Sequence, residues 1–197
     1  MVDNAKTSNG ASPTPITLTN VLKAWTNCKS PEAPERATKL LAGMEELYEH
    51  GTLKIKPNVV NYTVVLDCLA YACTSSAAEI AENMLKDMVS SEDPNLRPNV
   101  VSYNSVIKAW SHAKDPESAS KITILLRDLI DQSEKDSKLK PTENTFGTIL
   151  KFLADSDLPD KAERAMSIQN LMDIFLDDRK PVQPWVEKEL QRCMSDA

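Results

Sequence analysis

A phrase of about a dozen residues occurs four times in this chain, and each copy begins at a proline. The copies are PTPITLTNVLKAW from Pro13, PNVVNYTVVLDCL from Pro57, PNVVSYNSVIKAW from Pro98 and PTENTFGTILKFL from Pro141. Their spacing of roughly 40–45 residues is typical of repeat arrays, in which each unit is one supersecondary element. The repetition therefore predicts a stack of similar units.

Each copy of the phrase carries one apolar face at positions i, i+3, i+4 and i+7, which is the signature of an amphipathic helix. We call these the A helices. Their apolar sets are Leu18/Val21/Leu22/Trp25, Tyr62/Val65/Leu66/Leu69, Tyr103/Val106/Ile107/Trp110 and Phe146/Ile149/Leu150/Leu153.

A second amphipathic helix, the B helix, follows each A helix. Residues typical of helix starts precede three of them, and a capping-box spacing marks the other: Ser30-Pro31-Glu32, Asp115-Pro116-Glu117, Pro159-Asp160, and Ser76 with Glu79. The B stripes are Ala37/Leu40/Leu41/Met44, Ala81/Met84/Leu85/Met88, Ile122/Leu125/Leu126/Leu129 and Ile168/Leu171/Met172/Phe175. Such hairpins bury both faces only by stacking on neighbours, so the fold predicted is all-α, an α-solenoid of four helical hairpins.

The pattern also predicts the limits of the units. Residues 1–12 are a polar, flexible N-terminal segment, and the repeats span 13–56, 57–97, 98–140 and a degenerate 141–180. Residues 181–197 form a capping helix or a truncated fifth repeat, in which Val186, Leu190 and Cys193 keep the apolar stripe and Glu189 interrupts it.

The phrases PNVVNYTVVL and PNVVSYNSVI, with LLAGMEELYEHGTLKIKP before the first, resemble pentatricopeptide repeats over about residues 13–180. The Trp-x-x-Leu-Gly-x-x-Tyr pattern of tetratricopeptide repeats does not occur. The resemblance implies a helical array that binds single-stranded RNA, one repeat per base, in mitochondria or plastids. The N-terminal MVDNAKTSNGASPTP has no Arg and does not look like a presequence, so the cytoplasm is the other location expected.

A second stripe of the A helices faces away from the core and reads aliphatic, small polar, then Lys. Such an order suits apolar contact with base faces, a hydrogen bond to a base edge, and a cation near phosphate. The aliphatic positions are Ile16, Val60 and Val101, the small polar ones Thr19, Thr63 and Asn104, and the basic ones Lys23, Lys108 and Lys151. The fourth repeat has Asn144 and Gly147 instead of the first two types, and the second has Asp67 instead of Lys.

By the resemblance, each small polar residue reads a base together with the residue that follows the next inter-repeat proline. The pairs are Thr19 with Asn58, Thr63 with Asn99, and Asn104 with Thr142. Thr with Asn looks like the adenine-favouring pair of the family, whereas Asn with Thr leans towards a pyrimidine. The fourth repeat is assigned no base.

A purely structural interpretation remains open for each of these residues. Asn58, Asn99, Thr14 and Thr142 stand directly before A helices, where Asn and Thr make good N-caps. The residues Thr19, Thr63 and Asn104, and the lysines, can also be ordinary solvated helix positions. Trp25 and Trp110 lie on the apolar stripe and are predicted to belong to the core.

Charge and composition limit the alternatives. The net charge of −6 and the pI near 5.0 disfavour phosphate binding, although the acidic residues gather on the B helices and the A helices are balanced. A scaffold that binds proteins through the same groove is therefore the alternative function. No Gly-rich phosphate loop, HExxH or nucleophile elbow occurs, so we expect no enzyme, no cofactor and no small-molecule substrate. Four Cys without CxxC spacing predict core residues and neither a metal site nor disulfides, and no apolar run is long enough to span a membrane.

Overall fold

The computed structural model describes residues 15–28, 30–54, 56–177 and 180–195. Within these ranges it contains helices and no strand. The predicted flexible segment at residues 1–12 and the predicted cap Thr14 lie outside the described residues. The helices are α1 (Pro15–Cys28), α2 (Ala33–Glu49), α3 (Val59–Ala70), α4 (Ser75–Ser90), η1 (Pro94–Leu96), α5 (Val100–Ala113), α6 (Ser118–Lys135), η2 (Ser137–Leu139), α7 (Glu143–Ala154), α8 (Lys161–Phe175) and α9 (Pro184–Ser195).

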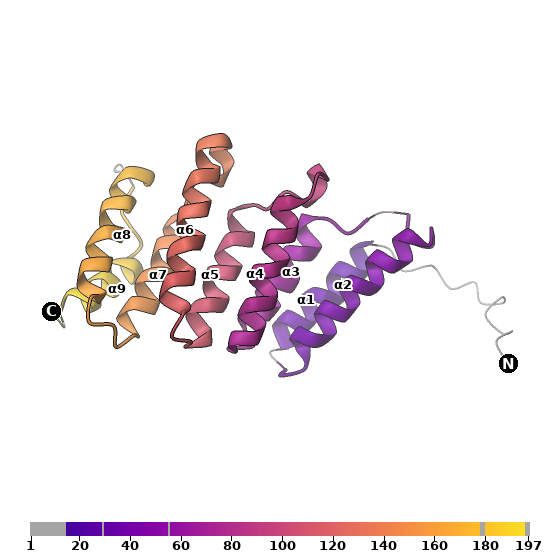
Figure 1. Cartoon of the computed structure of the whole chain (residues 1–197), viewed down its shortest axis with the longest axis horizontal. Helices are drawn as coiled ribbons and strands as arrows, with labels where there is room; N and C mark the ends of the chain where they lie inside the picture. Colours follow the sequence, from indigo (N-terminus) through magenta and orange to yellow (C-terminus); the bar gives the residue numbers. More distant parts are fainter. Residues whose placement is uncertain (1–14, 29, 55, 178–179, 196–197) are drawn as a thin grey trace, which may run out of the picture.

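Consecutive helices form antiparallel hairpins that stack side by side into two layers (Figure 1). The A helices α1, α3, α5 and α7 make one layer, which α9 extends, and the B helices α2, α4, α6 and α8 make the other. Each A helix packs on its own B helix and on the next A helix. The predicted all-α solenoid of four hairpins with a C-terminal capping helix is thus confirmed.

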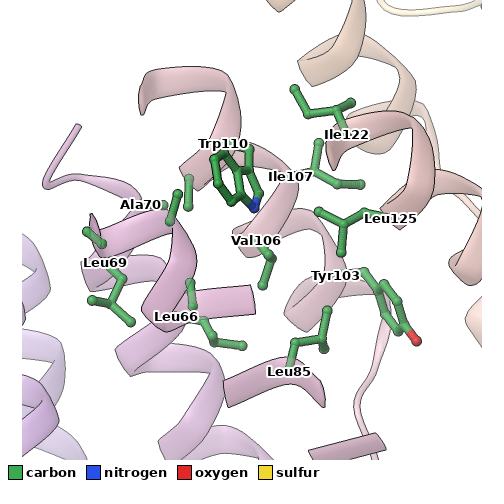
Figure 2. Close-up of a cluster of buried hydrophobic side chains, with 14 of the residues drawn as sticks. Leu66, Leu69, Ala70, Leu85, Tyr103, Val106, Ile107, Trp110, Ile122 and Leu125 are labelled. Carbon is green, nitrogen blue, oxygen red and sulfur yellow. The ribbon is translucent and has the colours of Figure 1, made fainter. Parts of the chain in front are cut away.

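The core lies between the two layers and runs continuously along the array. Figure 2 shows the part around Trp110, whose indole is buried in a cluster of side chains from α3, α4, α5 and α6. The A stripe of α5 and the B stripe of α6 are wholly buried. Because neighbouring hairpins share this core, the apolar periodicity in the sequence translates directly into the stack.

The stripe of the first A helix is less buried than its pattern predicts. Val21 is 40% exposed, and Trp25 is half-buried with the Arg36 guanidinium 4.8 Å from its ring centroid. Among the described helices α1 packs mainly on α2 and α3, so one flank has no A helix beside it. The apolar spacing shows which residues share a face of the helix, but not whether a neighbour covers that face.

Two further sequence predictions are corrected at this level. The N-cap of α4 is Thr74, whose hydroxyl accepts the backbone N–H of Ala77 at 3.2 Å, and the predicted Ser76 and Glu79 are exposed within the first turns. Cys28 and Cys73 are exposed, whereas Cys68 and Cys193 are core residues as predicted. Thr74 has the extended backbone that an N-cap requires, and a spacing rule alone does not identify it.

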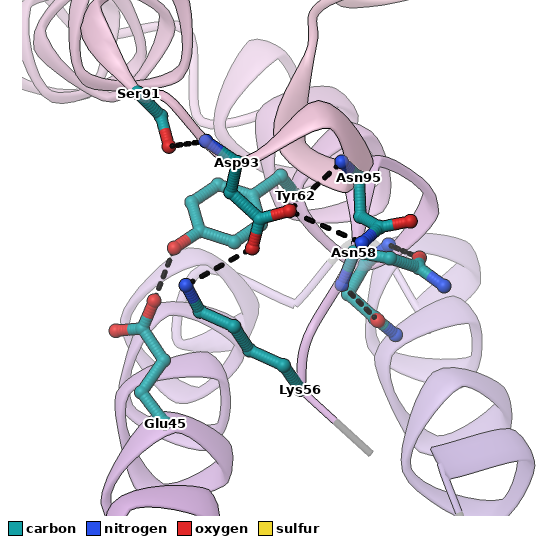
Figure 3. A network of polar contacts seen from close by, with 8 residues as sticks. Glu45, Lys56, Asn58, Tyr62, Ser91, Asp93 and Asn95 are labelled. Carbon is teal, nitrogen blue, oxygen red and sulfur yellow. Dashed lines mark hydrogen bonds and ion pairs between the residues drawn. The ribbon is translucent and has the colours of Figure 1, made fainter.

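The extra length of the repeats lies between a B helix and the next A helix. The short helices η1 and η2 each start after an aspartate, Asp93 or Asp136, whose side chain accepts a backbone N–H two residues on. Asp93 also binds the Lys56 ammonium at 3.1 Å, next to the hydrogen bond from Tyr62 to Glu45 (Figure 3). These contacts fix the chain before it enters α3 and α5, so the A helices are intact despite the longer repeat.

Candidate nucleic-acid interface

The aliphatic side chains of the predicted stripe point away from the core. Ile16, Val60 and Val101 are 72%, 49% and 58% exposed, and each lies in the first turn of its A helix. Exposed aliphatic residues at the same position of three successive helices form a periodic apolar surface. Asn144 has the corresponding position in α7 and is also exposed.

The small polar residues do not stand free on this surface. We call Thr19, Thr63 and Asn104 the reading residues, and Asn58, Asn99 and Thr142 the cap residues. A third set, the bridge residues Asn61, Ser102 and Thr145, lies between them and is buried. Each bridge residue is three positions after its cap residue, and it hydrogen-bonds both to that cap residue and to the reading residue of the preceding repeat.

The first unit joins α1 to α3. Asn58 caps α3, since its Oδ1 accepts the backbone N–H of Val60 at 3.0 Å and that of Asn61 at 3.4 Å. The Oδ1 of Asn61 accepts the backbone N–H of Asn58 at 3.0 Å, which completes a capping box. The Nδ2 of Asn61 then donates to Oγ1 of Thr19 at 2.7 Å.

The second unit joins α3 to α5 with the same arrangement. The Oδ1 of Asn99 accepts the backbone N–H of Ser102 at 3.0 Å, and the hydroxyl of Ser102 accepts the backbone N–H of Asn99 at 3.3 Å. The hydroxyls of Ser102 and Thr63 are 2.9 Å apart.

The third unit joins α5 to α7. The backbone N–H of Thr142 donates to Oγ1 of Thr145 at 3.0 Å, and Oγ1 of Thr145 donates to Oδ1 of Asn104 at 2.7 Å. Asn104 is buried, with only 9% of its surface exposed, whereas the sequence pattern placed it on a stripe that faces away from the core.

The N-cap interpretation is thus confirmed for Asn58 and Asn99, and it does not exclude contact with a ligand. Thr142 has the N-cap position and extended backbone at the start of α7, but its side chain makes no capping hydrogen bond there. The bridge residues were missed by the sequence analysis. Their signal is the capping box itself: a small polar residue follows each cap residue at the third position. What the sequence did not indicate is that the same side chain also reaches back to the preceding repeat.

The fourth repeat replaces this polar unit by an apolar one. When α9 is aligned on its proline, Pro181, Trp185 has the position of a bridge residue and Gly147 that of a reading residue. A Cβ on Gly147 would lie 2.6 Å from Cζ3 and 2.8 Å from Cζ2 of Trp185, too close for any side chain. The indole therefore fills the space that a fourth reading side chain would need.

A groove of about 1370 Å³ follows the A layer across the third and fourth repeats. Its lining combines predicted site residues with residues that the sequence analysis did not select. The predicted ones are Val101, Asn104, Lys108 and Lys151, and the others include Ser105, His112, Asn144 and Trp185. The half-buried ring of His112 lies with its Nδ1 2.9 Å from the carbonyl oxygen of Ala70.

A family model of the pentatricopeptide repeat domain matches residues 47–110 and 83–156, which together are more than half of the chain. The chain belongs to the pentatricopeptide repeat family. A search of curated proteins gives no match. Pentatricopeptide repeat proteins are in general RNA-binding helical repeat proteins without catalytic activity, so an RNA partner is what membership of the family indicates.

The three predicted lysines of this pentatricopeptide repeat array differ in their surroundings. Lys23 and Lys151 are exposed. Lys108 is half-buried, with its ammonium 3.1 Å from Oδ1 of Asp67 and 3.8 Å from the ring centroid of Tyr71. Burial alone would lower the pKa of Lys108, but its contacts with Tyr71 and Asp67 raise that pKa above its usual value. The ammonium is therefore charged and is neutralised by Asp67 of the preceding repeat.

Other classes of site find no support in the described residues. No group of three or more His, Cys, Asp or Glu side chains lies close enough together there to bind a metal ion. None of the described helices is both long and apolar enough to cross a membrane.

Proposed function

We propose that this protein binds single-stranded RNA along the A layer and selects bases with its three pairs of reading and cap residues. The observation that carries the proposal is the repeated unit of reading, bridge and cap residue, which places two polar side chains of adjacent repeats in a fixed relation beside an exposed aliphatic residue. A fixed relation lets two side chains meet one base edge without loss of side-chain entropy on binding. The aliphatic residues Ile16, Val60 and Val101 supply contact with the faces of the bases.

The first two sites select adenine on this proposal. The Oδ1 of Asn58 is already occupied by helix capping, as is Oδ1 of Asn99, so Nδ2 is the amide atom that donates to N1 of adenine. The hydroxyls of Thr19 and Thr63 accept from the exocyclic amino group of the same base. Guanine has a donor at N1, where it opposes the Nδ2 donor, and is therefore disfavoured.

The biological setting proposed is an organelle, mitochondrion or plastid, where binding would serve RNA processing, stability, editing or translation. The family resemblance supports this setting, and the cytoplasm is the alternative location. Three sites give weak binding on their own, since a stacked base contributes about 1–3 kcal/mol in single-strand binders.

A protein-binding scaffold is the second candidate function, and the charge of the groove favours it. Three lysines and four aspartates line the groove: Lys108, Lys114, Lys151, Asp67, Asp115, Asp155 and Asp157. Such a lining gives no net attraction for phosphate. Recognition of a peptide, however, would not require the reading and cap residues to recur in register.

The test is a change of base preference. Asn58→Asp with Asn99→Asp keeps an oxygen for each cap and places a carboxylate oxygen where Nδ2 was, which accepts from N1–H and N2–H of guanine. We expect the preference for AA over GG in short oligonucleotides at low salt to reverse. The control is Asn83→Asp with Asn170→Asp, which adds the same charge at exposed positions of α4 and α8 in the B layer. If the wild type binds neither oligonucleotide, or the double variant keeps the preference of the control, the scaffold function replaces RNA binding.

A further inference from the structure

We infer that Thr145 determines base specificity at the third site, because it fixes the direction of the Asn104 amide and so makes this site select a keto base, uracil over cytosine. The inference rests on the proposed RNA binding. On this inference the buried Thr145 touches no base, but it determines which amide atom of Asn104 faces the base.

The direction of hydrogen-bond donation in this unit is set by a backbone group. The N–H of Thr142 can only donate, and its acceptor at 3.0 Å is Oγ1 of Thr145. The hydroxyl proton of Thr145 goes to Oδ1 of Asn104, 2.7 Å from Oγ1, and the hydroxyl of Thr142, 3.2 Å from the same Oγ1, donates to Thr145 in turn. The chain of donors therefore runs from the α7 N-terminus through Thr145 to Asn104.

The hydrogen bond from Thr145 occupies Oδ1 of the Asn104 side chain. With Oδ1 held by Thr145, Nδ2 is the amide atom left for a ligand in the groove, which Asn104 lines. Asn104 and Thr145 are both buried, and the hydroxyl of Thr142 is 3.2 Å from Oγ1 of Thr145, so turning the amide over would require the hydroxyls of Thr145 and Thr142 to reverse their hydrogen bonds as well. Breaking the hydrogen bonds of buried polar groups is costly, so this arrangement persists when a ligand binds.

The exposed donor distinguishes keto from amino bases. Uracil has a carbonyl oxygen at C4, which accepts from Nδ2 of Asn104, whereas cytosine has an amino group there, which opposes it. The hydroxyl of Thr142 donates to Oγ1 of Thr145, 3.2 Å away, so its oxygen is left to accept from N3–H of uracil and its proton is not available to N3 of cytosine. The discrimination at this site therefore depends on Asn104 and Thr142, and on Thr145, which orients both.

In the first unit, where the bridge residue is Asn61, the reading residue offers an acceptor to the base and not a donor. Asn61 donates through Nδ2 to Thr19, because its Oδ1 is taken by the backbone N–H of Asn58. The reading atom there is a hydroxyl oxygen, which accepts from the amino group of adenine. The bridge residue and the reading residue thus act together at each site.

The experiment compares Thr145→Val, which keeps the shape of the side chain and removes its hydroxyl, with Thr145→Ser, which keeps the hydroxyl. Thr123→Val on the exposed side of α6 is the matched control, since its hydroxyl bonds only within its own helix, to the carbonyl of Ala119. The ligands are RNAs with three bases flanked by abasic nucleotides. Their base sequences are AAU, AAC and the reversed sequences UAA and CAA. Binding is measured by fluorescence anisotropy at low salt, and each variant is checked for folding by thermal melting.

We expect the wild type, Thr145→Ser and Thr123→Val to prefer uracil over cytosine by about 5- to 10-fold, the effect of one hydrogen bond. In Thr145→Val the preference should fall to nearly 1, while the preference for adenine at the first two positions stays as in the wild type. A merely structural role of Thr145 would weaken all RNAs equally and leave the ratio unchanged. That result, or a wild type that prefers cytosine, overturns the inference and leaves RNA binding intact. A wild type that binds none of the RNAs overturns the proposed function, and the inference with it.

Discussion

At the scale of the single residue, Trp110 shows how this fold accommodates polar atoms in its core. The ring is fully buried, and its Nε1–H donates to Oε2 of Glu82 at 3.1 Å. Glu82 is itself buried and is 3.4 Å from the ammonium of Lys121, besides its ion pair with Lys86. Burial alone would raise the pKa of Glu82, but Lys86 and Lys121 lower it below its usual value. The carboxylate is thus charged, and it satisfies the only polar atom of the indole.

Replacement of Trp110 by alanine should therefore destabilise the protein by roughly 3–5 kcal/mol, the usual cost for a buried aromatic side chain. Urea unfolding followed by circular dichroism measures this change. Trp25→Ala is the comparison, because Trp25 is only half-buried and its loss should cost clearly less. A cost for Trp110→Ala below about 1 kcal/mol would contradict its place in the core.

The candidate site was only partly predictable residue by residue. The recurrence of a small polar residue at one position of each repeat, and of Asn or Thr directly before the A helices, led to the selection of the reading and cap residues, and their contact with RNA stays a prediction. The sequence did not identify Asn61, Ser102 and Thr145 as links between repeats, since a capping box is a local pattern and a contact some forty residues away is not. Trp185 was missed for the same reason, because it packs against Gly147, which is distant in the sequence and has no side chain.

At the scale of the helix, the A helices could be predicted better than the B helices. Each A helix is marked twice, by the proline with its cap residue and by the apolar stripe, and the two signals agree. The B helices have varied starts, so the cap of α4 was misplaced from Thr74 to Ser76. Burial depended on neighbours that the pattern does not contain, as the exposed Val21 of α1 shows.

The helix α9 belongs to the A layer by its contacts. Val186 and Cys193 are buried as the stripe predicts, and α9 packs on α7 and α8. Glu189, which interrupts the stripe, forms an ion pair with Arg192, and Arg192 also binds Asp155 of the segment after α7 at 2.7 Å. An acidic residue at a core position is thus accommodated by an ion pair that links α9 to the fourth repeat.

The contact of Trp185 with Gly147 predicts that this junction does not tolerate a larger residue. Gly147→Ala should cost about 1–3 kcal/mol, since the added methyl group overlaps the indole ring and displaces it. Gly43→Ala is the matched control in the middle of α2: nothing lies within 4 Å of the added methyl, and alanine should stabilise that helix by up to about 1 kcal/mol. Thermal unfolding of both variants measures the difference. Equal stability of the two would show that Trp185 moves aside without cost.

At the scale of the whole molecule, charge limits the RNA affinity that we propose for the A layer. The net charge of −6 gives no long-range attraction. Exposed Lys23 and Lys151 are available for phosphate, whereas Lys108 is bound to Asp67, the residue with the same position in the preceding repeat. Affinity should therefore depend weakly on salt, with a slope of log K against log salt of about −1.4 for two phosphate contacts to a single strand.

Asp67→Asn tests this account, because it removes the partner of Lys108 without changing the size of the side chain. The ammonium of Lys108 then becomes available for a third phosphate, so we expect RNA affinity at low salt to rise several-fold and the slope to steepen to about −2.1. Glu79→Gln, an exposed position of α4 in the B layer, changes the net charge equally and should leave the slope as in the wild type. Titrations at four or five salt concentrations with one short RNA give both slopes. If the two variants behave alike, the gain comes from net charge alone, and Lys108 makes no phosphate contact.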